Sequence, residues 1–280
     1  MVKLLKFINK RFKPVVHPFN LNNAGLKTYA EWQYEKGLDT IAFYMPFTDK
    51  ETMFSGKTVL DVGCGAAGKT LYYASLGAEM VYGVDVVERY AVEAEALAEK
   101  LDLTEKFKFL TADAAELPFS DDMFDTIVMN DAMEHVNKPE AVLTETLRVL
   151  KPGGRIYINF PPYNHPFGAH LSDAVYIPWV HVFFNEKTLI QAYKDLIKGL
   201  PDEEDRINLR ITGDETGRET LGYINKMSIK RFRRMLDGMN IKPVYYSEAP
   251  LRNIFKFPAR LPGFKEFFVK MATCVIEKGR

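Results

Sequence analysis

The sequence is poor in cysteine and has no excess of either charge. Its two cysteines, Cys64 and Cys274, are far apart and form no C-x-x-C motif. They cannot build a zinc site by themselves, and their scarcity favours a reducing cytoplasm. The 37 lysine and arginine residues balance 37 aspartate and glutamate residues, whereas nucleic-acid-binding domains usually carry a basic excess. We therefore expect a cytoplasmic protein without a nucleic-acid partner.

Long hydrophobic runs are also missing. No stretch approaches the roughly 20 apolar residues of a transmembrane helix, and the N-terminal segment lacks the apolar core of a signal peptide. This segment, "MVKLLKFINKRFKPVVHPFN", is basic and amphipathic, with no acidic residue before Glu31. Such a segment can lie on an anionic membrane, which would make the protein peripheral to the membrane. Packing on its own domain is the commoner outcome, and the sequence leaves both open.

The 280 residues contain no internal repeat, and their central part alternates between strand-length apolar runs and helical patterns. Helices are expected at 69–75, at 88–101 and from 139, and a further helix and strand follow residue 228. The other expected strands are 58–62, 80–86, 107–113, 124–131, 155–160 and 267–278. Strands alternating with helices of this length predict an α/β fold with a doubly wound, mostly parallel, seven-stranded sheet.

Domain organisation follows from where this alternation stops. Residues 51–160 and 227–280 are expected to form the core. Residues 161–226 break the pattern with prolines, histidines and aromatics, which predicts a helical and irregular lid or substrate insertion, because long excursions from a compact core are usually functional. Residues 1–50 are expected to form an N-terminal cap segment.

The stretch "VLDVGCGAAGKT", residues 59–70, carries the clearest chemistry. Gly63, Gly65 and Gly68 match the G-x-G-x-x-G dinucleotide fingerprint. However, Asp61 precedes the turn and would repel a pyrophosphate held there, so it better suits a ligand with a positive end, such as an amino-acid ammonium group. Asp85 ends the second strand, where a carboxylate can accept both hydroxyls of a ribose. Asp61 could instead cap backbone amides, a common structural role.

Four segments in order resemble the class I S-adenosylmethionine-dependent methyltransferases, and most closely the small-molecule type that includes quinone-biosynthesis enzymes. They are "VLDVGCGAAGKT", "VYGVDV", "LTADAAELPFSDDMFDTIVMNDAMEHV" and "LRVLKPGGRIYINF". The resemblance covers residues 57–160 and implies a Rossmann-like methyltransferase fold with S-adenosyl-L-methionine as cofactor. Ala67 departs from it, because many members carry a glycine there.

The resemblance implies cofactor contacts at the ends of the first four strands. The backbone of Gly63, Cys64 and Gly65 would line the methionine portion, and Asn130 and Asp131 would border its amino-acid end. Cys64 is expected to be a small buried filler, because nothing near it in the sequence would lower its pKa.

The nucleoside end of the cofactor would lie beside the second and third strands. By the same resemblance, Asp85 would bind the ribose and Val86 would flank the adenine. Asp113 and Ala114 would meet the adenine edge, with the carboxylate accepting from the exocyclic amine. Asp113 could instead be a turn former before "AAELP".

Histidines are the candidate general bases. His135 follows the fourth strand beside the expected methyl position and ranks first, with His170 second; packing of His135 behind the site is an equal alternative. His165, His170 and His181 match no metal-ligand spacing, so no metal is expected.

The leading hypothesis is an enzyme that transfers a methyl group from S-adenosylmethionine to a small molecule, apolar or aromatic in view of the aromatic-rich insertion. A nicotinamide-dependent oxidoreductase is the first alternative, supported by the spacing of the glycines and Asp85. A non-catalytic binding module on the same fold is the second. No feature of the sequence specifies the acceptor or an oligomeric state.

Overall fold

The structure is a computed structural model that describes residues 1–255, 257–261 and 263–279. The chain divides into two compact units. The sheet unit comprises Thr28–Phe160, Lys230–Ala249 and Met271–Arg280, and the helical unit comprises Met1–Lys27, Pro161–Ile229 and Pro250–Lys270. Residues 28–50 therefore group with the sheet and residues 250–270 with the insertion, whereas we expected from the sequence that 1–50 would form a separate cap segment and that 227–280 would belong to the core.

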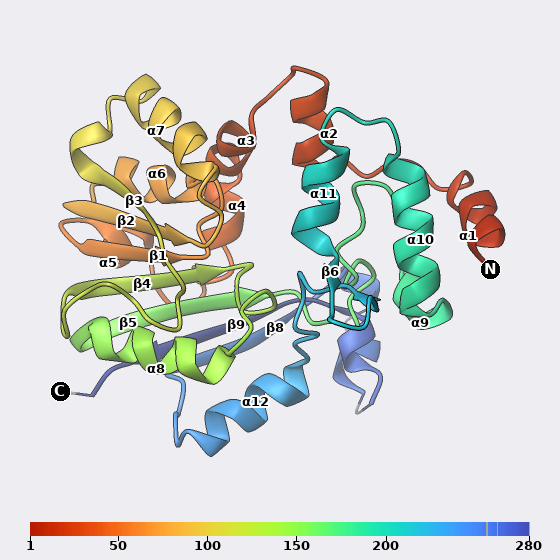
Figure 1. The fold of residues 1–280 in the computed structure, drawn as a ribbon. Helices are drawn as coiled ribbons and strands as arrows, with labels where there is room; N and C mark the ends of the chain where they lie inside the picture. Colours follow the sequence, from red (N-terminus) through yellow and green to blue (C-terminus); the bar gives the residue numbers. More distant parts are fainter. Residues whose placement is uncertain (256, 262, 280) are drawn as a thin grey trace. The chain divides into compact units, whose positions relative to one another are not determined.

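The sheet unit is built on a seven-stranded sheet, which confirms the predicted α/β fold class (Figure 1). The first five strands are parallel and β9 runs antiparallel to β5. In spatial order the strands are β3 (Phe107–Thr111), β2 (Met80–Asp85), β1 (Thr58–Val62), β4 (Phe124–Asn130), β5 (Leu150–Phe160), β9 (Val269–Glu277) and β8 (Tyr245–Pro250).

The strand order reverses between β1 and β4. Right-handed crossovers then send α6 (Gly68–Ser75) and α7 (Tyr90–Lys100) to one face and α8 (Pro139–Val149) to the other. The carboxyl ends of β1 and β4 consequently diverge at a switch point, which is where open α/β sheets bind ligands. The remaining helical elements of this unit are α3 (Tyr29–Glu35), α4 (Gly37–Ile41), α5 (Lys50–Phe54), η1 (Thr104–Lys106) and α12 (Ile229–Gly238).

Two predicted boundaries in the sheet unit were wrong by a few residues. β5 begins at Leu150, five residues early, because Phe124 pairs with Leu150 before an irregularity shifts the register to Thr126 and Arg155. α7 begins at Tyr90, because the Asp85 carboxylate accepts from the backbone nitrogen of Val87 and holds the preceding residues in a turn.

α3 docks firmly on the sheet unit, which explains why residues 28–50 belong there. The Glu93 carboxylate on α7 accepts from the backbone nitrogens of Tyr29 and Ala30 at 3.1 and 3.2 Å. A Cβ added to Gly68 would lie 1.9 Å from the Ala30 carbonyl oxygen. The close approach of α3 therefore requires the third glycine of the fingerprint.

The helical unit is more regular than the sequence suggested. It contains α1 (Val2–Asn9), α2 (Pro18–Asn23), α9 (Val180–Phe183), α10 (Glu186–Ile197), α11 (Glu203–Arg210), the hairpin β6 (Thr212–Gly213) and β7 (Glu219–Thr220), and the 3₁₀ turns η2 (Asn253–Phe255), η3 (Pro258–Arg260) and η4 (Lys265–Phe267). Leu5 of α1 and Tyr193 of α10 are fully buried in its core. Among the described residues, no helix has the length and apolarity needed to cross a bilayer.

A buried charge cluster ties the helical unit together. The Asp173 carboxylate, which is fully buried, receives hydrogen bonds from Arg206 Nη1 at 2.9 Å and the Tyr193 hydroxyl at 2.8 Å. Arg210 Nη2 lies 3.1 Å from its other oxygen, and Arg206 also donates to Asn20 of α2. Residues far apart in the sequence thus share one desolvated carboxylate.

Candidate functional site

The turn between β1 and α6 brings backbone and glycines to the switch point. Gly63, Gly65 and Ala67 all have left-handed backbones, with φ of 71°, 56° and 56°. A Cβ added to Gly63 would lie 2.8 Å from that of Ala132, which follows β4. Neither glycine adds a side chain of its own to this turn, which lets a ligand approach the backbone closely.

Asp85 supports the turn from the end of β2. Its Oδ2 accepts from the backbone nitrogen of Gly65 at 2.8 Å, and its Oδ1 accepts from that of Val87 at 2.9 Å. Burial raises the pKa of this carboxyl. Each carboxylate oxygen has two lone pairs. Each oxygen of Asp85 can therefore accept a second hydrogen bond, from one hydroxyl of a ligand. Asp85 therefore shapes the loop in addition to the ribose role that we predict for it.

Val86 and Asp113 border this side of the site. Val86 is 67% exposed directly after β2, which leaves an apolar side chain uncovered beside the Asp85 carboxylate. Asp113 is exposed and its Oδ1 accepts from the backbone nitrogen of Ala115, so the turn-forming role is present. Its second oxygen can still accept from a ligand, and Ala114 beside it is buried. An apolar surface with flanking acceptors suits a purine nucleoside.

Asp61 is buried beneath the turn. Its Oδ2 accepts from the Thr70 hydroxyl of α6 at 2.6 Å, which is a structural contact to a side chain and not the backbone-amide cap considered from the sequence. Burial raises the pKa of Asp61 to about 7, against the opposing effects of the Thr70 hydrogen bond and the Lys69 charge. A nearby positive ligand would favour its charged form.

Cys64 is buried and its thiol pKa is raised well above the ordinary value, mainly by burial, so it is no nucleophile.

The two polar residues at the end of β4 have different environments. Asn130 is buried, with its amide oxygen accepting from the Tyr44 hydroxyl at 2.6 Å and its amide nitrogen donating to the Tyr73 hydroxyl at 2.7 Å. These partners leave its backbone better placed than its side chain to meet a ligand. Asp131 has a left-handed backbone, with φ of 53°. Its carboxylate pairs with Lys69 Nζ at 2.7 Å, which joins the β4 end to α6.

His135 lies beside a buried glutamate. Its Nε2 is 3.8 Å from Glu134 Oε1. Burial, followed by the nearby charge of Asp131, raises the pKa of Glu134 well above its ordinary value. Neither carboxylate oxygen of Glu134 has a hydrogen-bond partner among the described residues. A buried carboxyl that favours its protonated form, next to an imidazole, can take part in proton transfer.

His170, the second candidate base, belongs to the helical unit. Its backbone is left-handed, with φ of 52°, and its carbonyl oxygen accepts from Arg210 Nε at 3.0 Å. His165 and His181 lie in the same unit, and burial lowers the pKa of each to about 4. His165 and His181 are therefore neutral at pH 7. The ranking of His135 over His170 as the general base stays a prediction.

Sequence reasoning missed four residues at the switch point. Gln33 on α3 clamps the glycine turn, because its amide donates to the Cys64 carbonyl oxygen and accepts from the backbone nitrogen of Gly68, both at 3.2 Å. A Cβ added to Gly65 would lie 3.2 Å from the Tyr29 hydroxyl, which places that side chain at the turn as well. The capping box formed by Thr28 and Glu31 marks the start of α3, and Lys69 and Glu134 lie inside the quoted motifs, so these signals could have been used.

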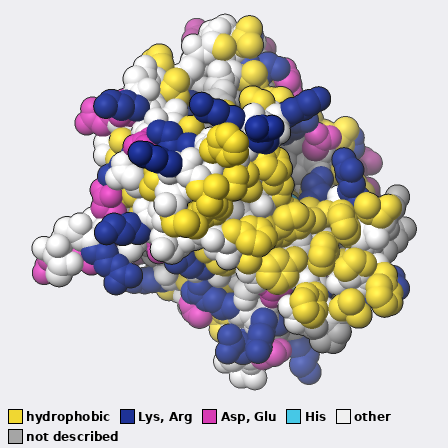
Figure 2. Space-filling view, turned by 90° about the vertical axis from the view of Figure 1, so that its right-hand side faces the viewer, with side chains coloured by type: hydrophobic (Ala, Val, Ile, Leu, Met, Phe, Trp, Pro, Cys, Tyr) yellow, Lys and Arg dark blue, Asp and Glu magenta, His cyan; other side chains and the backbone are white. Residues whose placement is uncertain are grey.

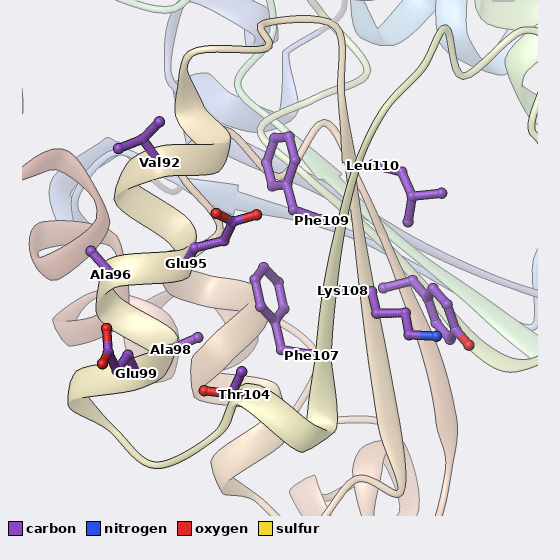
Figure 3. A pocket seen from close by; sticks show the side chains of 11 residues that line it. Val92, Glu95, Ala96, Ala98, Glu99, Thr104, Phe107, Lys108, Phe109 and Leu110 are labelled. Atoms are coloured by element: carbon purple, nitrogen blue, oxygen red, sulfur yellow. The ribbon is translucent and has the colours of Figure 1, made fainter.

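A separate groove lies at the β3 edge of the sheet, between that strand and α7 (Figure 3). Its volume is about 920 Å³. Figure 3 shows the rings of Phe107 and Phe109 turned toward α7, with Glu95 on the facing helix. None of the predicted cofactor residues lines this groove, so the switch point remains the candidate site.

The residues at the switch point fit S-adenosylmethionine. The glycine surface, the exposed Val86 and the Asp85 acceptors match a nucleoside, and the site is rich in carboxylates. Asp61, Asp85, Asp131 and Glu134 contribute four carboxyl groups, and Lys69 contributes an ammonium group that pairs with Asp131. An acidic site suits a cationic ligand better than a pyrophosphate.

Known proteins resemble the same part of the chain. Residues 60–158 match the family model described as a methyltransferase domain. A chloroplastic tocopherol O-methyltransferase from Arabidopsis thaliana is 39% identical over 112 residues, which are 40% of this chain and 32% of that protein. A demethylmenaquinone methyltransferase from Clavibacter sepedonicus is 36% identical over 104 residues, which are 37% and 41% of the two chains. The matches thus span less than half of these relatives.

A solved structure matches over most of the chain. The crystal structure of a putative S-adenosylmethionine-dependent methyltransferase from Listeria monocytogenes superposes with a TM-score of 0.54, covering 88% of this chain and 99% of that one. The sequence identity is 16%, so this likeness speaks for the fold alone. It agrees with the strand order found in the sheet unit.

Proposed function

We propose that the chain, whose residues 60–158 form a methyltransferase domain, transfers a methyl group from S-adenosylmethionine to a small-molecule acceptor that is apolar or aromatic. The observation that carries this proposal is the carboxylate-rich turn at the β1 and β4 ends, in which Asp85 holds the glycine loop open beside an exposed Val86. The two relatives named above act on tocopherol and demethylmenaquinone by their names, which supports a small acceptor.

In this proposal the switch-point residues bind and orient. The Asp85 carboxylate accepts from the ribose hydroxyls and Val86 packs against the adenine. Asp113 accepts from the adenine amine, and Asp61 counters the positive charge of the methionine end. S-adenosylmethionine, when bound, supplies a methyl group on a positively charged sulfur. Methyl transfer then depends mainly on a dry, shaped site that holds the acceptor in line.

A proton must leave the acceptor if its nucleophile is a hydroxyl or an amine. We assign that proton to His135, because an imidazole is suited to act as a general base at neutral pH. Glu134, 3.8 Å away, is assigned as a positioning residue beside that imidazole, and its carboxyl favours the neutral form because it is buried.

A labelled-methyl assay across fractionated metabolite extracts, with identification of the labelled product, tests the proposal. Label appearing in an apolar or aromatic product supports it. A thermal-shift titration with S-adenosylmethionine and with NAD separates the nicotinamide alternative, because stabilisation by NAD alone would contradict a methyltransferase. Cofactor binding without label in any fraction would favour the non-catalytic module.

The helical unit is assigned the role of lid and acceptor site. Its aromatic-rich residues 161–226 interrupt the sheet-forming sequence, and lids are usually drawn from the less stable parts of a fold. Hydrogen exchange with and without cofactor and acceptor tests this role. Added protection in 1–27 and 161–226 is the expected result, whereas protection confined to 57–130 would mean that the insertion serves a partner instead.

The cellular setting is also a proposal. We place the protein in the cytoplasm because both cysteines are free and buried, and we expect no nucleic-acid partner because the chain has zero formal net charge. Filter binding with duplex DNA and with RNA checks the second point, and measurable retention at physiological salt would contradict it.

A further inference from the structure

The helical unit exposes an unusual number of large apolar side chains. Nine of them, with exposed fractions from 38% to 75%, come from three segments of this unit: α1, α9 and residues 254–264. We refer to these nine residues as the apolar face: Met1, Leu4, Phe7, Val182, Phe183, Ile254, Phe257, Leu261 and Phe264. Single exposed apolar residues are ordinary, but clusters of this kind mark an interaction site.

α1 has two apolar sides. Leu5 is buried in the core of the helical unit, with Val2 and Ile8 packed beside it. Leu4 and Phe7 are turned to solvent and are 49% and 59% exposed. One side of α1 therefore packs on its own unit, which is the commoner outcome for such a segment. The other side, with Leu4 and Phe7, is exposed to solvent.

The other two segments are anchored in the same way. In α9, Val180 and Phe184 are buried, whereas Phe183 between them is 70% exposed. In the third segment, the Phe255 ring stacks on Phe268 with centroids 5.2 Å apart, while Phe257 is exposed. The outward aromatic rings of Phe183 and Phe257 thus lie close in sequence to residues that pack inside the helical unit.

Contacts within the helical unit link the three segments. α1 packs on α10, which directly follows α9. The Phe268 ring meets that of Trp179, at the start of α9, with centroids 6.3 Å apart. Figure 2 shows a broad hydrophobic area with lysine and arginine side chains near its borders.

The charge of these segments is strongly positive. Residues 1–27 contain six lysines and arginines and no acidic residue, and residues 250–270 contain five and one glutamate. Since the formal net charge of the whole chain is zero, the basic excess is concentrated in these two parts. Lys3, Lys10 and Lys13 are exposed beside the outward side of α1, and Arg11 lies over the Phe7 ring at 5.3 Å.

We propose that the apolar face and its basic surroundings dock the protein on an anionic lipid bilayer, with the exposed aromatic rings entering the boundary between headgroups and acyl chains. Apolar side chains surrounded by lysine and arginine match both layers of such a surface. A protein partner with this chemistry would need an apolar centre inside an acidic ring, whereas a bilayer presents both everywhere. The proposal does not depend on the methyltransferase reaction.

Co-sedimentation of the full-length protein with phosphatidylglycerol vesicles and with phosphatidylcholine vesicles tests this docking. We expect binding to phosphatidylglycerol that falls steeply with salt, because the Debye length shortens from ~10 Å at 0.1 M to ~3 Å at 1 M. Binding to phosphatidylcholine should be at least about tenfold weaker, since each basic residue near an anionic surface contributes about fivefold in affinity.

Matched variants separate the two contributions. The double variant Lys10→Glu with Lys13→Glu should bind phosphatidylglycerol vesicles at least about tenfold more weakly. The control, Lys50→Glu with Lys106→Glu, makes an equal charge change in the sheet unit and should retain most of this binding. Phe257→Ser with Phe264→Ser should also weaken it about tenfold or more, whereas Val92→Ser, at a 72% exposed residue of α7, should not. Thermal unfolding followed by circular dichroism confirms that each variant is folded.

Three results would overturn the proposal. The first is no sedimentation of the wild-type protein with phosphatidylglycerol. The second is equal loss of binding in the Lys10/Lys13 and Lys50/Lys106 variants, which would mean attraction by overall charge alone. The third is a dimer in light scattering that Phe257→Ser with Phe264→Ser dissociates, which would show that a second copy covers the apolar face.

Discussion

The Asp61 carboxylate accepts a 2.6 Å hydrogen bond from the Thr70 hydroxyl, and this contact joins β1 to α6 across the glycine turn. Asp61 therefore helps to hold β1 and α6 together, and its carboxylate lies beneath the turn at which the cofactor is expected to bind. Because the carboxyl is buried and its pKa is raised to about 7, its protonation state is poised to change when a charged ligand binds above it.

Stability should therefore depend on pH through Asp61. In the unfolded chain the carboxyl ionises near its ordinary value of 3.8, whereas in the folded protein burial raises the pKa to about 7. The folded state thus holds the proton more tightly, and the associated stability is complete below about pH 4 and is lost as the pH rises through about 7. The full difference corresponds to at most ~4 kcal/mol.

Asp61→Asn removes that dependence. Urea unfolding at pH 5 and at pH 8 should show the wild type losing stability relative to Asp61→Asn as the pH rises, since the amide keeps an acceptor for Thr70 without ionising. A parallel decline in both proteins would contradict the raised pKa of Asp61.

The affinity for S-adenosylmethionine should rise with pH through Asp61, whereas the stability that Asp61 contributes falls. A cationic ligand favours the ionised carboxylate, so binding of S-adenosylmethionine should tighten between pH 6 and pH 8 in the wild type and less so in Asp61→Asn. Asp61→Asn should weaken S-adenosylmethionine and leave adenosine nearly unaffected in calorimetry. Equal losses for the two ligands would make Asp61 purely structural.

Asp85→Ala should weaken S-adenosylmethionine binding at least about tenfold. Two hydrogen bonds to a charged acceptor are at stake, each contributing roughly 1.5 to 3 kcal/mol. The same change frees the backbone nitrogens of Gly65 and Val87, so we now expect a measurable loss of stability as well. Calorimetry with Asp85→Asn as a milder control separates the two effects, and unchanged affinity in Asp85→Ala would refute the ribose assignment.

His135→Gln should lower turnover about 10²-fold or more, the lower end for a lost general base, with cofactor affinity nearly unchanged. His170→Gln in the helical unit serves as the comparison. Loss of activity in His170→Gln but not in His135→Gln would reverse the ranking. If both variants keep their turnover, the acceptor is a nucleophile that needs no protein base.

Asp173→Ala should destabilise the helical unit by ~3–5 kcal/mol, because it removes the carboxylate that pairs with the buried Arg210 and leaves the buried Arg206 paired with Asp202. Chemical denaturation followed by tyrosine and tryptophan fluorescence measures the change. Asp195→Ala, which removes a half-exposed ion pair with Lys6 in the same unit, is the control and should cost under ~1 kcal/mol. Similar effects of the two changes would mean that the buried cluster contributes little.

Local patterns in the sequence were enough to predict the sheet and most of the switch point. A short apolar run placed β1 at its observed start, and Pro139, a residue favoured in the first turn of a helix, did the same for α8. The glycine spacing and the carboxylates that end the strands located the turn, since parallel strands bring their carboxyl ends to one edge. Those features depend on residues close together in the chain.

Tertiary structure decided what depends on distant contacts. α3 reaches the turn through Gln33 and Tyr29, and its docking requires Glu93 on another helix. The raised pKa of Asp61 arises from desolvation, which no local pattern records. Likewise, Leu5 and Phe7 are both large apolar residues of α1, yet one is buried and the other is 59% exposed, because burial is set by what packs against a side chain and not by its own chemistry.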